Sequence, residues 1–306
     1  MKILFAGTPA NAARTLEDLV DAGHTVVGVL TRSDAATGRS ATVTESPVAT
    51  AASALGIPTY KSNLVDGAVL DWITAQKPDL GVIVAFGCIL RRNALEIPVK
   101  GWINLHYSLL PKYPGATPVQ QALLEGAEIT GVTVFELDEG VDSGPVLAAE
   151  TVEILPEENS GSLLERLTGT GSKLLIQTLD NFDDLQRSSV IQDSEARGAV
   201  TRKITRLMAR LDFNVSASEF VNKVRALNPE PVAWFELESL AIRVLEASVF
   251  GTAEVPKGLA SLVESELVVG CLKGSVLLKT VQPAGKKAMS GADWFRGLHK
   301  DSLLLS

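Results

Sequence analysis

Two polar segments of the sequence carry side chains whose types and spacing suit acid–base chemistry on a small substrate. In the first, INLHYSLLP, Asn104 and His106 stand two residues apart at the end of an apolar run. Residues two apart in a β-strand point to the same face, so the amide and the imidazole would meet one substrate together. Pro111 cannot continue a central strand, which places His106 at the carboxyl end of the strand. A capped turn with a hydrogen-bonded histidine is the alternative interpretation.

The second segment, DEGVDSGP, follows the apolar run VTVFEL and holds Asp138, Glu139 and Asp142. Its two glycines and its proline predict a sharply folded loop. The carboxylates lack the spacing of an EF-hand loop, so the pattern does not predict calcium binding. A carboxylate beside an imidazole can hold its tautomer or raise its pKa. We predict such a role for Asp142, whereas Asp138 and Glu139 fit a solvated acidic turn equally well.

The elements that position these segments alternate between strand and helix patterns. Strands are predicted at residues 2–7, 25–31, 57–60, 79–86, 102–106, 130–137 and 146–154, and helices at 11–22, 47–56, 65–75 and 163–185. A polar loop is predicted at 32–46. This alternation, with β-branched strands, indicates an α/β, Rossmann-like, mostly parallel sheet with helices on both faces. Ligands of such sheets bind beyond the carboxyl ends of the strands. GTPANAA is not a dinucleotide fingerprint, and the sequence holds no P-loop.

The character of the sequence changes near residue 190. Residues 191–205 form an extended polar linker, and a helix is predicted within 211–227 with Ser216 or Ser218 as its N-cap. Alternating apolar residues then predict short strands at 233–237, 241–249, 265–272 and 275–282. Turn residues separate these strands, which is typical of a small β-barrel of the OB-like kind. We therefore predict a catalytic domain at 1–190, a linker at 191–205 and a C-terminal β-barrel domain at 206–306.

Charge and cysteine content limit the classes of partner. The net charge of −8 at first disfavours a nucleic-acid ligand. Residues 1–201 hold 14 basic against 25 acidic residues, a net charge of −11, whereas residues 202–306 hold 14 against 11, a net charge of +3. The second part would therefore tolerate a polyanion. Cys88 and Cys271 lie far apart, which disfavours a disulfide or a zinc site. Short apolar runs and an N-terminus without a signal-peptide pattern predict a cytoplasmic protein with no membrane span.

The motif N-x-H-x-S-L-L-P, followed by the Asp142 loop, resembles the folate-dependent formyltransferase family. Members of this family move a formyl group from 10-formyltetrahydrofolate to an amine. The resemblance implies that Asn104, His106 and Asp142 are catalytic and that no metal is needed. Asn104 and His106 would donate hydrogen bonds to the oxyanion, each contributing about 3–4 kcal/mol. Asp142 would orient His106 and help to move a proton.

The same resemblance implies the binding residues. The turn after the strand at 79–86 and the loop after His106 would hold the folate. The implied folate-binding residues are Phe86, Gly87, Ile89, Ser108, Leu109, Leu110, Pro111 and Asp138. The segments FAGTP, AFGCIL, RLDF, RALNP and QPAGKKAMS extend the resemblance over nearly the whole chain. They are similar to the branch of the family that formylates the α-amino group of initiator methionyl-tRNA.

For this acceptor, the implied tRNA-binding residues are Arg39, Lys203, Arg206, Lys286 and Lys287, in a protein expected to be a monomer. The loop at 37–43 has Arg39 but lacks the lysine pair usual in the family, and Glu230 stands where tryptophan is common. A sugar-nucleotide N-formyltransferase and a 10-formyltetrahydrofolate hydrolase are the alternative enzymes with the same catalytic core. A folate- or tRNA-binding module without catalysis is the alternative from another class.

Overall fold

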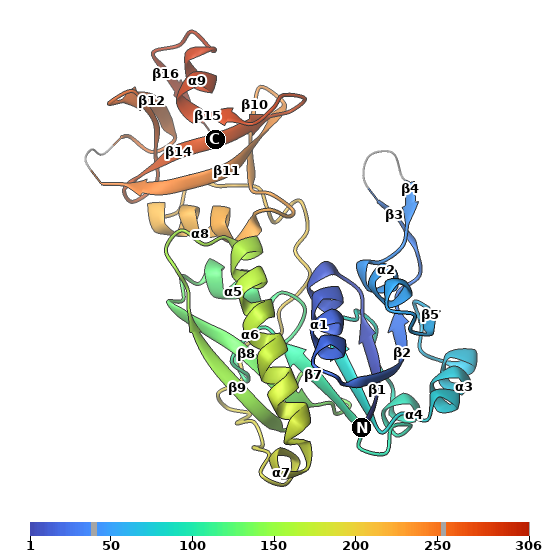
Figure 1. Cartoon of the computed structure of the whole chain (residues 1–306). Helices are drawn as coiled ribbons and strands as arrows, with labels where there is room; N and C mark the ends of the chain where they lie inside the picture. Colours follow the sequence, from blue (N-terminus) through green and yellow to red (C-terminus); the bar gives the residue numbers. More distant parts are fainter. Residues whose placement is uncertain (38–41, 252–254, 306) are drawn as a thin grey trace. The chain divides into compact units, whose positions relative to one another are not determined.

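The computed structural model describes residues 1–37, 42–251 and 255–305 (Figure 1). The chain divides into two compact units. Unit 1 comprises Met1–Gly115, Ile129–Glu153 and Leu164–Val200, and unit 2 comprises Ala116–Glu128, Ile154–Leu163 and Thr201–Ser306. Each unit is therefore built from separate stretches of the sequence, and the domain limits at 190 and 206 stay a prediction.

Unit 1 is built on a seven-stranded sheet with the order β5-β2-β1-β6-β7-β8-β9. Five strands run parallel, namely β1 (Lys2–Gly7), β2 (Thr25–Thr31), β5 (Thr59–Lys61), β6 (Leu80–Val84) and β7 (Trp102–His106). The last two, β8 (Ile129–Glu136) and β9 (Val146–Glu153), pair antiparallel. The mostly parallel sheet predicted from the sequence is thus confirmed.

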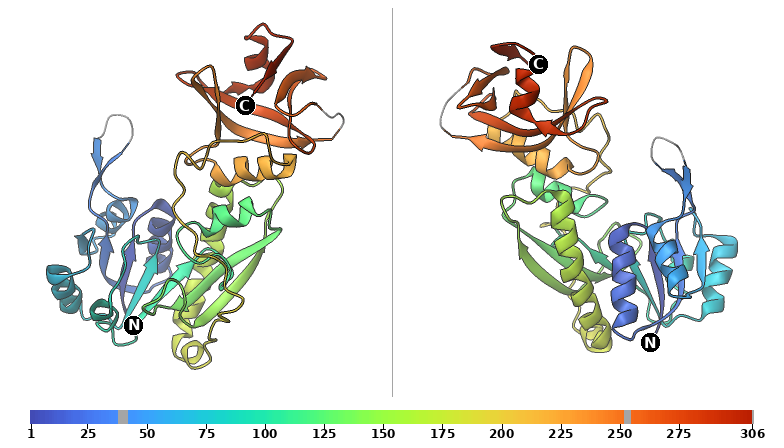
Figure 2. Two further views of the ribbon diagram at one scale, coloured as in Figure 1. Left: turned by 180° about the vertical axis from the view of Figure 1, so that it is seen from behind. Right: turned by 45° about the horizontal axis from the view of Figure 1, so that its top comes forward.

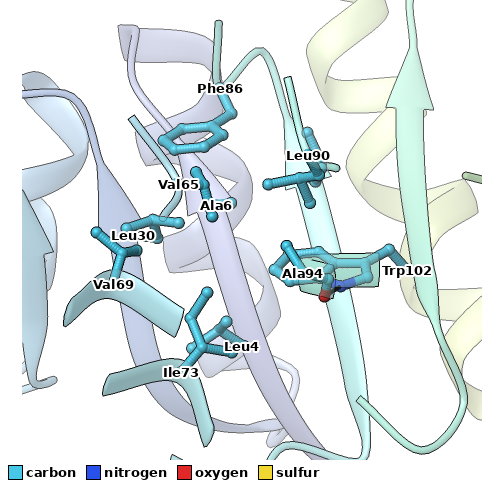
Figure 3. Close-up of a cluster of buried hydrophobic side chains, with 11 residues drawn as sticks. Leu4, Ala6, Leu30, Val65, Val69, Ile73, Phe86, Leu90, Ala94 and Trp102 are labelled. Atoms are coloured by element: carbon cyan, nitrogen blue, oxygen red, sulfur yellow. Dashed lines mark hydrogen bonds between the residues drawn. The ribbon is translucent and has the colours of Figure 1, made fainter. Parts of the chain in front are cut away.

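Helices cover both faces of this sheet. Unit 1 has α1 (Ala10–Asp21), α2 (Pro47–Ala54), α3 (Gly67–Gln76), α4 (Arg92–Leu95) and α7 (Phe182–Arg187), and most of α6 (Ser160–Asp180). Figure 3 shows the cluster on one face, where Leu4 and Ala6 of β1 pack with Ile73 of α3 and Trp102 of β7. On the other face α1 and α6 lie side by side (Figures 1 and 2), joined by a Ser172–Thr15 hydroxyl contact of 3.1 Å. The apolar residues of the strands are therefore buried on both faces of the sheet.

Unit 1 differs from the sequence predictions at the polar loop and at the long helix, and α4 is an additional short helix. The predicted polar loop at 32–46 contains an antiparallel pair of strands, β3 (Ala35–Thr37) and β4 (Thr42–Thr44). The single helix predicted at 163–185 is two helices, because Asn181 leaves helical geometry with φ −117° between α6 and α7. Its side-chain amide donates to the carbonyl of Gln177 at 2.9 Å, a local bond that competes with continuation of the helix.

Unit 2 carries an antiparallel sheet with the order β10-β11-β14-β13-β12-β16. Its strands are β10 (Trp234–Leu237), β11 (Leu240–Phe250), β12 (Leu259–Val263), β13 (Glu266–Gly270), β14 (Ser275–Pro283) and β16 (Ser302–Leu304), with β15 (Met289–Ser290) beside β14. No pairing within 201–251 and 255–305 joins β10 to β16, so the barrel is an open half-barrel. The predicted class is confirmed, while β12, β15 and β16 are additional short strands.

Three helices complete unit 2: α5 (Pro118–Leu124), α8 (Ala217–Leu227) and α9 (Gly291–Arg296). Helix α8 packs against β11 and β14. It begins at Ser216, one of the two predicted N-caps, whose hydroxyl accepts from the Glu219 amide in a capping box. The Phe213 ring stacks on Phe220 of α8 at 5.2 Å and contacts Phe235 of β10 at 5.8 Å. These aromatic contacts tie the helix to the sheet.

Candidate active site

Asn104 and His106 occupy the carboxyl end of β7, as predicted. They share the face of the strand on which Trp102 packs, because alternate residues of a strand point the same way. Across the pairing with β8, Asn104 lies opposite Phe135 and His106 lies opposite Thr133. The Phe135 ring meets the imidazole edge-on, with 6.4 Å between ring centroids. The amide and the imidazole therefore lie together at one end of the sheet, and the Phe135 ring of β8 packs beside them.

The imidazole of His106 is buried, with 6% of the residue exposed, and its two nitrogens have different partners. Nε2 lies 2.9 Å from the carbonyl oxygen of Tyr113. A carbonyl only accepts, so Nε2 carries the proton of the neutral ring. Nδ1 lies 3.7 Å from Asp142 Oδ2. Burial lowers the pKa of His106 below its ordinary value, and the Asp142 charge and the Tyr113 carbonyl oppose this shift. The lowered pKa favours the neutral ring, whose unprotonated Nδ1 faces the carboxylate.

Asp142 is held by backbone groups in a tight loop. Its φ of +50° is in the left-handed region, and its Oδ2 accepts a hydrogen bond from the Gly115 amide at 2.6 Å. The loop closes at Gly144, where a Cβ atom would lie 1.8 Å from the Glu136 carbonyl oxygen, so only glycine fits. The Asp142 side chain keeps 17% of its surface exposed. It is therefore fixed near His106 and still open to a ligand.

An extended segment, residues 188–198, fastens this loop from outside, and we call it the strap. Val190 and Val146 exchange two backbone hydrogen bonds of 2.8 and 2.9 Å. Gln192 Nε2 donates to the carbonyl of Asp142 at 3.1 Å and to that of Gly144 at 2.7 Å. Farther along, the Arg197 guanidinium donates to the carbonyl of Val141. The sequence suggested only a polar linker here, and nothing in its composition signals these contacts to the Asp142 loop.

The loop after His106 is fixed by Thr133, another residue that the sequence analysis missed. The Thr133 hydroxyl donates to the Ser108 carbonyl at 2.7 Å and accepts from the Leu110 amide at 3.2 Å. The Ser108 hydroxyl donates to the Lys112 carbonyl at 2.6 Å. At the end of the loop, the Pro111 carbonyl accepts from Gly198 of the strap at 3.2 Å. The predicted folate-binding loop at 108–111 is thus rigidly joined to the rest of the site.

The turn after β6, with Ala85 at φ +47° and Gly87 at φ +80°, carries three predicted folate-binding residues. The Phe86 ring is buried in the cluster of Figure 3, and the Phe86 carbonyl accepts from the Thr8 hydroxyl at 2.8 Å. Ile89, by contrast, is 86% exposed. A ligand beside this turn therefore meets its backbone and the Ile89 side chain rather than the ring of Phe86.

Asp138 shapes the loop that contains Asp142. Its carboxylate accepts from the Ser143 hydroxyl at 2.8 and 2.9 Å and from the Gly140 amide at 2.9 Å. These bonds fold the chain back between the two aspartates. The structure therefore gives Asp138 a local supporting contact, and its part in folate binding stays a prediction.

The Asn104 amide has an unused polar atom. Its Oδ1 is buried without a hydrogen-bond partner, a costly arrangement unless a ligand supplies one. In the described ranges, no group of three His, Cys, Asp or Glu residues is arranged to hold a metal ion. An amide with free hydrogen-bonding capacity, a neutral imidazole and a carboxylate suit proton transfer at a polar carbonyl substrate.

Four of the five predicted tRNA-binding residues belong to unit 2 and lie apart from these groups in the sequence. Lys203 and Arg206 are exposed on the segment before α8, and Lys286 and Lys287 are exposed in the turn between β14 and β15. Arg39 lies outside the residues that the structure describes. Among the helices of the described residues, none is long and apolar enough to cross a membrane.

Two family models match the chain. The model for formyl transferase matches residues 1–179, and that for the formyl transferase C-terminal domain matches residues 203–299. The chain therefore belongs to the formyl transferase family, which confirms the resemblance predicted from the motifs.

Within this family, the chain is similar over nearly its whole length to methionyl-tRNA formyltransferases. It is 42% identical to that of Paenarthrobacter aurescens (strain TC1) over 299 residues, covering 97% of both chains. It is 40% identical to that of Thermobifida fusca (strain YX), covering 97% of this chain and 96% of the relative.

Solved structures share the fold at low identity. The N-formyltransferase from Helicobacter canadensis in complex with folinic acid and dTDP-3-aminofucose has a TM-score of 0.68 at 16% identity, covering 91% of this chain and 98% of that one. HypX from Aquifex aeolicus in complex with tetrahydrofolic acid has a TM-score of 0.64 at 17% identity, covering 98% of this chain and 48% of that one. These likenesses support the fold, and both of those structures are complexes with a folate compound.

Proposed function

We propose that the chain transfers the formyl group of 10-formyltetrahydrofolate to the α-amino group of initiator methionyl-tRNA, giving N-formylmethionyl-tRNA. The observation that carries this proposal is the identity of about 40% over nearly the whole chain to proteins of that name. The acceptor's chemistry suits the site. An α-amino group has an ordinary pKa near 8, so a fair fraction is neutral at pH 7 and can attack without a strong base.

The oxyanion that forms on attack needs a hydrogen-bond donor, and we assign this role first to Asn104. The Asn104 amide lies on the same face of β7 as His106, and its Nδ2 carries two N–H donors. A well-placed donor to such an oxyanion contributes about 3–4 kcal/mol. His106 was expected from the sequence to be a second donor, but its Nε2 proton is engaged by Tyr113. Only Nδ1, once protonated, is free to donate to the oxyanion.

His106 then carries the proton that must leave the amine. When the amine nitrogen forms its bond to the formyl carbon, its excess proton passes to Nδ1. The ring returns a proton to the folate nitrogen as the bond from that nitrogen to the formyl carbon breaks. Asp142, 3.7 Å away, stabilises the transient imidazolium, and the Tyr113 carbonyl holds the other ring nitrogen. Proton transfer of this kind typically contributes about 10²–10⁴-fold.

The remaining assignments follow from this proposal. The folate would lie against the turn at 86–89 and the loop at 108–111, with catalysis in residues 1–190. The barrel at 206–306 would bind the tRNA through Arg206, Lys286 and Lys287, helped by Lys203 in the preceding segment and by Arg39. We propose that the protein acts in the cytoplasm, as expected for an enzyme with a tRNA substrate, and that it acts as a monomer.

The choice of acceptor tests the proposal. The protein is incubated with 10-formyltetrahydrofolate and either methionyl-tRNA or an aminosugar nucleotide, and formylated product is separated from the acceptor. We expect formyl transfer to the tRNA alone. Transfer only to the sugar would overturn the proposed acceptor. Consumption of the formylfolate at the same rate without any acceptor would instead identify a hydrolase.

A further inference from the structure

A pocket in unit 2 combines aromatic, proline and arginine side chains. Its volume is about 350 Å³, and its lining includes Arg206, Trp234, Arg243, Glu230 and the prolines at 229 and 231. Pockets that hold small ligands usually measure about 300–1,000 Å³. The Trp234 indole is fixed in place, because its Nε1 donates to the carbonyl of Arg206 at 2.9 Å. The pocket therefore has a preformed aromatic wall.

Three arginines at this pocket have no carboxylate partner. The guanidinium carbons of Arg206 and Arg210 lie 5.8 and 5.9 Å from the centroid of the Trp234 ring. The Arg243 guanidinium donates to the side-chain oxygen of Gln282 at 3.4 Å. Across residues 1–37, 42–251 and 255–305, none of the three forms an ion pair. These exposed charges are free to meet an anion.

Three other cations of the same unit form ion pairs within the protein. Lys279 pairs with Glu246 at 3.2 Å, Arg296 with Asp293 at 2.7 Å and Lys300 with Glu238 at 3.3 Å. The pocket arginines differ from these because the only acidic residue in the lining is the exposed Glu230. The lining holds two guanidinium groups and one carboxylate, a formal excess of one positive charge, and Arg210 lies over the Trp234 ring just outside the lining. This positive charge favours an anionic ligand such as an RNA phosphodiester.

The combination of surfaces indicates the chemical class of the ligand. Guanidinium groups bind phosphate through paired hydrogen bonds, and aromatic and arginine planes stack on nucleobases. We propose that this pocket binds one nucleotide of the tRNA, its base against Trp234 and its flanking phosphates against Arg206, Arg210 and Arg243. The identity of the RNA rests on the proposed function. Of the five residues predicted to bind tRNA, only Arg206 belongs to this pocket, so Trp234, Arg210 and Arg243 are new assignments.

Affinity for tRNA at two salt concentrations tests the pocket. Binding of fluorescent initiator tRNA to the full chain is measured at 50 and 200 mM KCl for wild type, Arg243→Gln, Trp234→Leu and Arg296→Gln. Loss of one phosphate contact should reduce the slope of log affinity against log salt by about 0.9, so Arg243→Gln should flatten it. Loss of stacking in Trp234→Leu should weaken binding about five-fold or more at both salt concentrations. Arg296→Gln also removes one positive charge, but Arg296 already pairs with Asp293 of the same chain. This variant should therefore bind tRNA like wild type.

The outcomes separate this proposal from the proposed function. If wild type formylates methionyl-tRNA but both pocket variants match Arg296→Gln in affinity and slope, the pocket proposal is wrong. If wild type does not formylate methionyl-tRNA, the proposed function fails first. Trp234→Phe keeps an aromatic face and provides a second test in case Trp234→Leu does not fold. Trp234→Phe should bind tRNA within about three-fold of wild type, since stacking tolerates any aromatic ring. Circular dichroism checks that Trp234→Leu is folded. If Trp234→Phe loses as much affinity as a folded Trp234→Leu protein, stacking on this residue is contradicted.

Discussion

Gln192 offers a test of whether the strap positions the catalytic aspartate. Its side-chain amide holds the loop by donating to the carbonyls of Asp142 and Gly144 at 3.1 and 2.7 Å. Its own oxygen, Oε1, is buried without a partner. Replacement by methionine removes both the donor and the unsatisfied acceptor while keeping a similar shape. The change therefore loosens the Asp142 loop without opening a cavity.

The two effects on stability largely cancel. Two lost hydrogen bonds cost about 1 kcal/mol each, and removal of a buried unsatisfied acceptor returns about 1–3 kcal/mol. We expect the free energy of unfolding of Gln192→Met to stay within about 1 kcal/mol of wild type. Activity should respond more strongly, since a displacement of about 1 Å in a catalytic group can cost about 10²-fold. We expect kcat for formyl transfer to fall by about 10- to 100-fold with KM for both substrates nearly unchanged.

Steady-state kinetics and urea unfolding of the same preparations measure both quantities. Gln177→Met makes the same chemical change on an exposed position of α6 and serves as the control. It should match wild type in kcat and in stability. If Gln192→Met keeps wild-type kcat, or loses kcat only in proportion to a loss of folded protein, the strap does not position Asp142.

Three further changes test other parts of the site and fold. Asp142→Asn keeps an oxygen acceptor but removes the charge beside the imidazole, so kcat should fall about 10²–10⁴-fold with melting temperature little changed; a loss below three-fold in single-turnover assays would exclude the charge from catalysis. His106 has a pKa below its ordinary value in the folded protein, so the unfolded chain binds the extra proton and stability falls as pH drops through about 6.5 toward the folded pKa. His106→Gln removes this loss, and urea unfolding from pH 8 to pH 5 should therefore show wild type losing stability relative to the variant; a constant difference would contradict burial of a neutral ring. Gly81→Ala would place a Cβ atom 2.1 Å from the Trp102 ring, so it should cost about 3 kcal/mol or more by overpacking, whereas Gly169→Ala in α6, 3.6 Å from its nearest neighbour, should be neutral or stabilising in thermal unfolding.

The sequence predicted the positions of the catalytic side chains because local rules determine them. Strands β2 and β7 begin and end where the apolar runs do. The two-residue spacing placed Asn104 and His106 on one face, and the glycines around Asp142 predicted its tight loop. These features depend on a few neighbouring residues, which is where strand alternation and turn chemistry are informative.

The contacts that orient those side chains were not predictable, since they join distant residues through the backbone. The Tyr113 carbonyl that fixes the tautomer of His106 and the Gly115 amide that binds Asp142 can come from any residue type. Gln192 lies 50 residues from Asp142 in sequence. Its surroundings resemble an ordinary polar linker. Backbone donors and acceptors leave no signature in a single sequence, so only the fold reveals them.

Transfer by a His106→Ala variant tests the central claim most directly. Single-turnover formation of N-formylmethionyl-tRNA is measured from labelled 10-formyltetrahydrofolate, together with the affinity of each protein for the folate. We predict rapid transfer by wild type, and for the variant a rate reduced about 10²–10⁴-fold with folate affinity within about three-fold of wild type. A folded variant that transfers the formyl group at the wild-type rate would contradict catalysis by this imidazole.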